Sequence, residues 1–177
     1  TYYLYEVKSQ SGLDTDKMNE SLRALLNMGV KYVNRATTAW TPSSGEELYY
    51  DDMKEWIEFA HSYDPEIIFE AGIFETTGPN IDGITIPKYV CDAFGVKYTG
   101  RSFDHTLTLH SDNYGRNRWE KNLHVPDITK TETQMFIYYK ATRYIDMGIE
   151  SLHLGQANLI GHKDIENACW TKVIHMI

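Results

Sequence analysis

The apolar positions of the chain switch repeatedly between helical and strand-like spacing. Runs rich in β-branched and aromatic residues predict strands at 2–7, 31–35, 66–75 and 151–154. Apolar residues recurring every three or four positions, together with cap signals, predict helices at 16–28, 51–63, about 87–94, 127–147 and from about 164 onward. The pattern therefore predicts an α/β protein in which strands and helices alternate along the chain.

The connections between these elements indicate which α/β fold to expect. The segments after the strands are long and polar, whereas the turns into the strands, MGVKY, YDPEI and DMGIES, are short. This asymmetry is typical of (β/α)8 barrels, and the turn QSGLDTD lacks the GxGxxG of a dinucleotide fold. We predict one domain over 1–177, about half of a TIM-type barrel, with an insertion at about 96–126 and a hairpin around 106–110.

The ends of the chain lead to two further expectations. The chain begins without Met and stops at WTKVIHMI, within a helical pattern that has no C-cap, so we expect a fragment of a longer protein. Half a barrel leaves two strand edges open, so we expect a homo-oligomer or a missing second half. TYYLYEVKSQ is not a signal peptide and no apolar run approaches ~18 residues, so we expect no membrane span and a protein that is cytoplasmic or of a location the sequence leaves open.

Composition narrows the classes of partner. The net charge of −8 argues against nucleic acid, whose phosphates need a basic surface. The two cysteines, Cys91 and Cys169, are far apart, which favours free thiols over a disulfide or zinc scaffold. The 13 tyrosines and 4 tryptophans suit sugar surfaces, although they would equally suit an aromatic-rich core.

Strand alternation predicts a cluster of ionisable side chains. One such residue per predicted strand faces the barrel axis, namely Glu6, Arg35, Glu70 and His153. Buried charges must be neutralised by one another or open to a ligand, so the cluster is either a structural network or a site. Glu75 ends its strand at the mouth of the barrel, where barrel enzymes place their catalytic groups. We predict Glu70, Glu75 and His153 as catalytic residues.

Other polar and aromatic residues would bind the substrate. Trp40 and Trp119, in loops, are candidate platforms for a sugar ring, and Gln156 can hydrogen-bond hydroxyl groups. We predict that they bind substrate together with Glu6 and Arg35. Residues of types suited to metal binding are His110, His124, His153, His162, Glu70 and Glu75. No HxH or HExxH spacing groups the histidines, so we predict neither metal nor cofactor.

Three stretches carry a resemblance to a known family. IIFEAGIFETT, IPKYVCDAFG and YIDMGIESLHLGQ are similar to those of uncharacterised bacterial proteins with a glycoside-hydrolase-like TIM barrel. The resemblance implies a carbohydrate-active enzyme. Retaining glycosidases of this barrel usually place an Asn-Glu pair after the fourth strand, whereas this chain has HLGQ with Gln156 there. That departure leaves room for a different acid, a phosphorylase or lyase, or a silent sugar binder.

The function we expect is that of a carbohydrate-active, glycoside-hydrolase-like enzyme, or part of one, using carboxylates at strand ends. Its partner would be a carbohydrate or another small polar substrate. One alternative is a metal-dependent barrel enzyme acting on a sugar or a small amide. The other is a non-catalytic half-barrel that binds sugar or dimerises.

Overall fold

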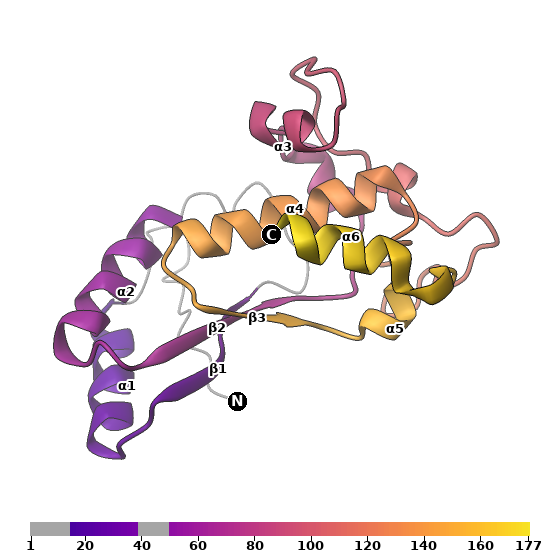
Figure 1. Cartoon of the computed structure of the whole chain (residues 1–177). Coiled ribbons are helices and arrows are strands. Elements are labelled where there is room, and N and C mark those ends of the chain that lie inside the picture. The colour runs from indigo at the N-terminus through magenta and orange to yellow at the C-terminus, as the bar shows by residue number, and fades with distance from the viewer. Residues whose placement is uncertain (1–14, 39–49) are drawn as a thin grey trace. The chain divides into compact units, whose positions relative to one another are not determined.

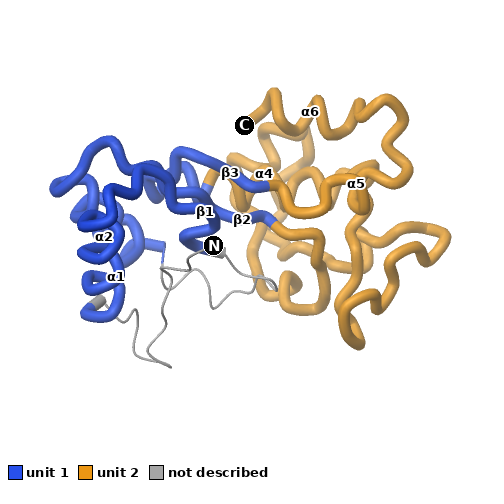
Figure 2. Tube along the Cα trace, turned by 90° about the horizontal axis from the view of Figure 1, so that it is seen from below, with its two compact units in different colours: residues 1–39, 45–73, 143–153 blue, residues 40–44, 74–142, 154–177 orange. Residues whose placement is uncertain are grey.

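The computed structural model describes residues 15–38 and 50–177, in two compact units. The first unit comprises 1–39, 45–73 and 143–153, and the second comprises 40–44, 74–142 and 154–177 (Figure 2). Glu6 with its predicted strand, and Trp40, lie outside the described residues. Among the described residues, no helix has the length and apolarity that crossing a membrane would require.

The first unit contains a small parallel sheet. Its strands are β1 (Tyr32–Thr38), β2 (Ile68–Ile73) and β3 (Ser151–Leu154), in the order β1-β2-β3 (Figure 1). Helix α1 (Thr15–Asn27) precedes β1, and α2 (Tyr50–Tyr63) precedes β2. Gly29, two positions after the last residue of α1, has a φ of 69°, a left-handed conformation that ends a helix at little cost.

One face of this sheet is the apolar core of the first unit. Trp56 of α2 packs against Phe69 of β2, with ring centroids 5.6 Å apart, and its indole N–H donates to Asn19 of α1 at 3.0 Å. Val33 of β1 is paired with Phe69 and is equally buried. Because side chains alternate along a strand, Glu70 lies on the opposite face from Phe69. The Glu70 side chain therefore lies on the face of β2 that is opposite to the apolar core of the first unit.

A bulge interrupts β1 beside Glu70. Val33 pairs with Phe69 and Thr37 with Ala71, so β1 uses four residue steps where β2 uses two. Arg35 lies within this bulge at a φ of 51°, in the left-handed region that non-glycine residues rarely adopt. The bulge turns the backbone N–H of Arg35 toward the Glu70 carboxylate instead of toward a ladder partner.

The second unit is built from helices and irregular segments. Its helices are α3 (Lys88–Ala93), α4 (Thr131–Asp146, whose last turn belongs to the first unit), α5 (Ala157–Ile160) and α6 (Ala168–Met176). Its core joins the 81–91 segment and Phe103 to Met135, Phe136 and Tyr139 of α4. Phe103 and Phe136 meet edge to face, with centroids 5.2 Å apart. This helix-and-loop core supports the segments that follow β2 and β3.

The predicted half barrel is wrong, although the α/β class is correct. The described residues form three parallel strands, too few for half of a TIM barrel. The reason lies after Ile73, where the chain leaves the sheet and builds a separate compact unit over 74–142 before β3 returns at Ser151. The long segment after β2 is therefore not a barrel loop.

Most predicted elements exist, with differences at their ends. A 3-10 helix at His105–Thr108 replaces the predicted hairpin, and Leu109 makes an isolated antiparallel bridge to Pro126. Helix α4 begins at Thr131 and not at Asp127, because the Asp127 carboxylate accepts hydrogen bonds from Thr129 and closes a turn first. The pattern after 164 is interrupted until α6 begins at Ala168.

Candidate functional site

Most of the unsatisfied buried side-chain atoms among the described residues belong to the second unit. Glu75 Oε2, Thr76 Oγ1 and both ring nitrogens of His110 are buried and complete no regular hydrogen bond in the described structure. A buried polar atom without a partner costs about 1–3 kcal/mol, more for a charged group, so such atoms are rare and indicate a ligand, a water or a catalytic role. We therefore take these residues as the candidate site.

Glu75 and Gln156 form the centre of this site. Glu75 is 1 % exposed, and the side-chain amide of Gln156 donates to its Oε1. Glu75 follows the last residue of β2 by two positions, and Gln156 follows the last residue of β3 by two positions. The carboxyl ends of neighbouring parallel strands are where α/β proteins place ligands. One oxygen of the carboxylate is thus oriented by the protein, while the other has no protein partner among the described residues.

The backbone around Gln156 is shaped to bring these groups together. Gln156 has a φ of 39°, in the left-handed region, immediately before α5. A Cβ on Gly155 would lie 2.5 Å from a ring carbon of Phe74 and 2.8 Å from Glu75 Oε2. Glycine at 155 is therefore required for the close approach of this turn to Glu75.

His110 and Asp127 form a second buried pair in the same unit. Their side chains are 0 % and 2 % exposed, and Nδ1 of His110 lies 3.4 Å from Oδ2 of Asp127. Tyr114 meets the His110 ring edge to face at 5.0 Å and stacks on His162 at 3.8 Å. Burial lowers the pKa of His110, and the nearby Asp127 carboxylate opposes this in part. The imidazole is consequently neutral near pH 7.

The link between the two buried groups runs through two threonines. The Oγ1 atoms of Thr77 and Thr108 are 3.3 Å apart. Thr77 follows Glu75 by two positions, and Thr108 precedes His110 by two. The backbone N–H of Asp127 donates to the carbonyl of Thr108 at 2.7 Å. Glu75 and the His110–Asp127 pair therefore belong to one cluster of adjoining segments.

The lowered histidine pKa predicts a dependence of stability on pH. Since the folded-state pKa of His110 lies below its unfolded value, the unfolded state binds more protons as the pH falls through about 6.5, and the free energy of unfolding decreases. His124, whose pKa burial also lowers, acts in the same direction. Urea titrations at about pH 7.5 and about pH 5.5 should show this loss, and His110→Gln should reduce it. An equal loss in the variant would contradict the assignment.

Glu70 has a different environment from Glu75. Its Oε2 accepts from the Tyr32 hydroxyl at 2.6 Å, and its Oε1 accepts from the Asn34 amide at 2.7 Å and from the backbone N–H of Arg35 at 3.1 Å. Tyr32 also shares a 2.8 Å hydrogen bond with Ser151 of β3, and the bond to Glu70 raises the pKa of Tyr32. This carboxylate has the satisfied contacts of a structural network that joins the three strands.

The structure also places the other predicted site residues that it describes. His153 lies in β3 on the same face as Ser151, by strand alternation, and is half-buried. The Arg35 side chain reaches Asn34 Oδ1 at 3.3 Å. Trp119 is 38 % exposed in the 111–123 segment of the second unit. Two contacts between predicted residues are defined by their hydrogen bonds, that of Glu75 with Gln156 and that of the Arg35 backbone with Glu70.

No family model, curated protein or solved structure matches this chain. The functional assignment therefore rests on the geometry of its own residues. The sequence did not mark Asp127 or Tyr32 as site residues. Asp127 has the appearance of a helix start, and Tyr32 has that of an ordinary strand residue. Sequence reasoning considered His110 only as a possible metal ligand. Their partners are distant in sequence, and no local motif marks them.

One grouping of possible metal ligands occurs among the described residues. Ligand atoms of Asp82, Asp104 and His105 lie within 4.8 Å of one another. However, His105 already donates its backbone N–H and its Nδ1–H to Asp82, at 2.8 Å each. The Asp104 side chain accepts a hydrogen bond from the backbone N–H of Thr106 and so caps the 3-10 helix. These mutual hydrogen bonds account for the cluster without an ion.

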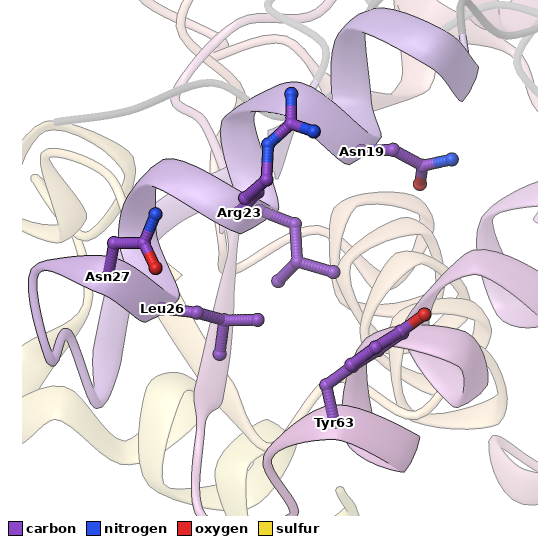
Figure 3. Close-up of a pocket in the computed structure, with 6 residues that line it drawn as sticks. Asn19, Arg23, Leu26, Asn27 and Tyr63 are labelled. Carbon is purple, nitrogen blue, oxygen red and sulfur yellow. The ribbon is translucent and has the colours of Figure 1, made fainter.

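A well-formed pocket lies elsewhere, in the first unit. It measures about 280 Å³, and residues of α1 line one side while Tyr63, at the end of α2, lines the other (Figure 3). Asn27 and Tyr63 end the helices that lead into β1 and β2, so this pocket is near the amino ends of those strands. Among the described residues, its lining combines Leu22 and Leu26 with Arg23 and includes no buried acid or base. The described part of this lining therefore does not offer the groups that proton transfer needs.

Proposed function

We propose that this chain is a carbohydrate-active enzyme, or the part of one, in which Glu75 transfers a proton at a glycosidic oxygen. The observation that carries the proposal is the asymmetry of the Glu75 carboxylate, with Oε1 hydrogen-bonded to Gln156 and Oε2 buried without a protein partner among the described residues. A substrate hydroxyl or glycosidic oxygen would supply the missing partner. In hydrolysis, the Glu75 carboxyl group gives its proton to the leaving oxygen as the glycosidic C–O bond breaks, and a water molecule then adds to the anomeric carbon and returns a proton to Glu75.

The surroundings of Glu75 support a polar, uncharged reacting group. Gln156 is neutral, and its carbonyl oxygen and second N–H are the groups that sugar hydroxyls pair with. The neighbouring Thr76 hydroxyl is also buried without a partner in the described structure. Carboxylate, amide and hydroxyl together form a set of donors and acceptors suited to a polyhydroxy ligand.

A direct test measures turnover and binding on a panel of glycans. The purified chain would be incubated with neutral and acidic polysaccharides, followed by detection of new reducing ends and by thermal unfolding with oligosaccharides. We expect new reducing ends from at least one class, together with a raised Tm in the presence of its oligosaccharides. Absence of both effects across the panel would overturn the proposal.

A further inference from the structure

A rigid loop lies between the 3-10 helix at His105–Thr108 and the buried His124. Within it, Asn113, Gly115, Asn117 and Asn122 all have φ between 50° and 66°, which is left-handed. The backbone N–H of Asn117 donates to His124 Nδ1 at 3.0 Å, and the N–H of Asn122 donates to the Asn117 side chain at 2.8 Å. Side-chain hydrogen bonds of this kind stabilise turns made by asparagine. The tip of the loop is therefore held in a defined conformation.

This loop is attached directly to the segment that carries Glu75. Thr77 and His124 exchange two backbone hydrogen bonds, each 2.8 Å long. A Cβ on Gly78 would lie 2.4 Å from the backbone oxygen of Asn122, so the two chains are in close contact there. Glu75 precedes Gly78 by three positions. The loop consequently borders the segment of the candidate site.

The tip of the loop is cationic and aromatic. Residues 116–121 read RNRWEK, and all of them are exposed. Arg116, Arg118 and Lys121 make no ion pair within the described residues, and the single acid there is Glu120. The Arg118 guanidinium lies 5.3 Å from the centroid of the Trp119 ring. A concentration of positive charge is notable on a chain whose net charge is −8.

We propose that this loop binds the carboxylates of an acidic, uronate-containing glycan, which makes acidic polysaccharides the substrate class of the Glu75 site. The inference rests on the proposed function. Guanidinium groups pair with carboxylates through two parallel hydrogen bonds, and an indole face stacks on a sugar ring. On an acidic protein, a local positive surface also raises the local concentration of an anionic ligand. The loop supplies both groups next to the reacting segment.

Binding of matched glycans tests this assignment. The probe is an oligogalacturonate, and the control ligand is the same oligosaccharide with its carboxylates methyl-esterified, both measured by calorimetry on the whole chain. We expect the acid to bind at least about tenfold more tightly than the ester, with affinity decreasing as salt rises. Equal affinity for the two ligands would overturn the proposal.

Variants locate the binding on the loop. The double variant Arg116→Gln with Arg118→Gln should bind the oligogalacturonate about tenfold or more weakly than the unmodified chain. Trp119→Ala should lower the affinity for both the oligogalacturonate and its methyl ester. The charge-matched control, Lys54→Gln with Lys97→Gln, removes two exposed lysines outside the loop and should leave the affinity within about twofold. Equal losses in control and loop variants would contradict the assignment, as would tighter binding of a single-stranded oligonucleotide than of the glycan.

These experiments test the binding role of the loop and the catalytic role of Glu75 independently. Glu75→Gln should retain oligogalacturonate binding, because the loop does not require that carboxylate. Glycan turnover without a preference for acid over ester would overturn the loop assignment alone. Binding of the acid by the loop without turnover of any glycan would instead overturn the proposed catalytic role of Glu75.

Discussion

Replacing Glu75 by glutamine is expected to lower glycan turnover by about a hundredfold or more, the scale on which acid–base catalysis contributes to rate. The substitution preserves shape, and one amide oxygen still accepts from Gln156. What it removes is the carboxyl group whose Oε2 is buried without a partner in the described structure. The measurement is the initial rate of reducing-end formation on the best glycan of the panel, with circular dichroism to verify the fold.

Two matched variants make this result specific. Glu70→Gln changes the same chemical group in the first unit, and Glu166→Gln changes an exposed one. We expect both to retain most of the turnover of the wild type. The stability of Glu75→Gln should not fall, because a neutral amide replaces a buried carboxylate with an unsatisfied oxygen. A large loss of turnover in Glu70→Gln with none in Glu75→Gln would assign the proton transfer to Glu70 instead.

Replacing Glu70 by alanine is expected to have the largest effect on stability, about 3 kcal/mol of the free energy of unfolding. The carboxylate is 6 % exposed and accepts from Tyr32, Asn34 and the Arg35 backbone. Alanine removes the acceptor of all three donors. The bulge of β1 then loses the hydrogen bond from the Arg35 N–H to the Glu70 carboxylate. For a chain of this size the loss corresponds to a decrease in Tm of roughly 6–12 °C.

The conservative variant Glu70→Gln keeps the side-chain volume, so comparing it with Glu70→Ala shows how far the loss of stability comes from the hydrogen bonds. Its carbonyl oxygen can accept from Asn34 and from the Arg35 N–H, and its amide can donate to Tyr32, whose hydroxyl then donates to Ser151. We expect a loss of only about 1 kcal/mol, measured by urea unfolding. If alanine and glutamine cost the same, the network would not be what stabilises the three strands.

The contrast between Glu70 and Glu75 shows how environment assigns roles to similar residues. Both are buried glutamates in or just after β2. Glu70 has its oxygens occupied by three donors within the first unit, whereas Glu75 has one oxygen occupied and one without a partner in the described structure. A sequence pattern sees two acidic residues near one strand and cannot distinguish them.

The sequence by itself determined the local elements. Helices α1, α2 and α4 and strands β1, β2 and β3 follow from the spacing of apolar residues, because burial on one face repeats with the period of the element. Alternation also predicted that Glu70 and His153 would be set apart from the apolar residues of their strands. The barrel did not follow, since strand count and closure depend on where the chain goes after Ile73.

The tertiary structure alone decided the site. Glu75 and Gln156 are 81 positions apart, and their contact depends on two neighbouring strands ending together and on the space at Gly155. His110 lies close to Asp127 because the backbone N–H of Asp127 donates to the carbonyl of Thr108, which joins their two segments. Periodicity is a property of consecutive residues, whereas these contacts are set by packing between distant ones. The sequence predicted Glu75 and Gln156 as site residues, but only the folded chain shows that their side chains contact each other.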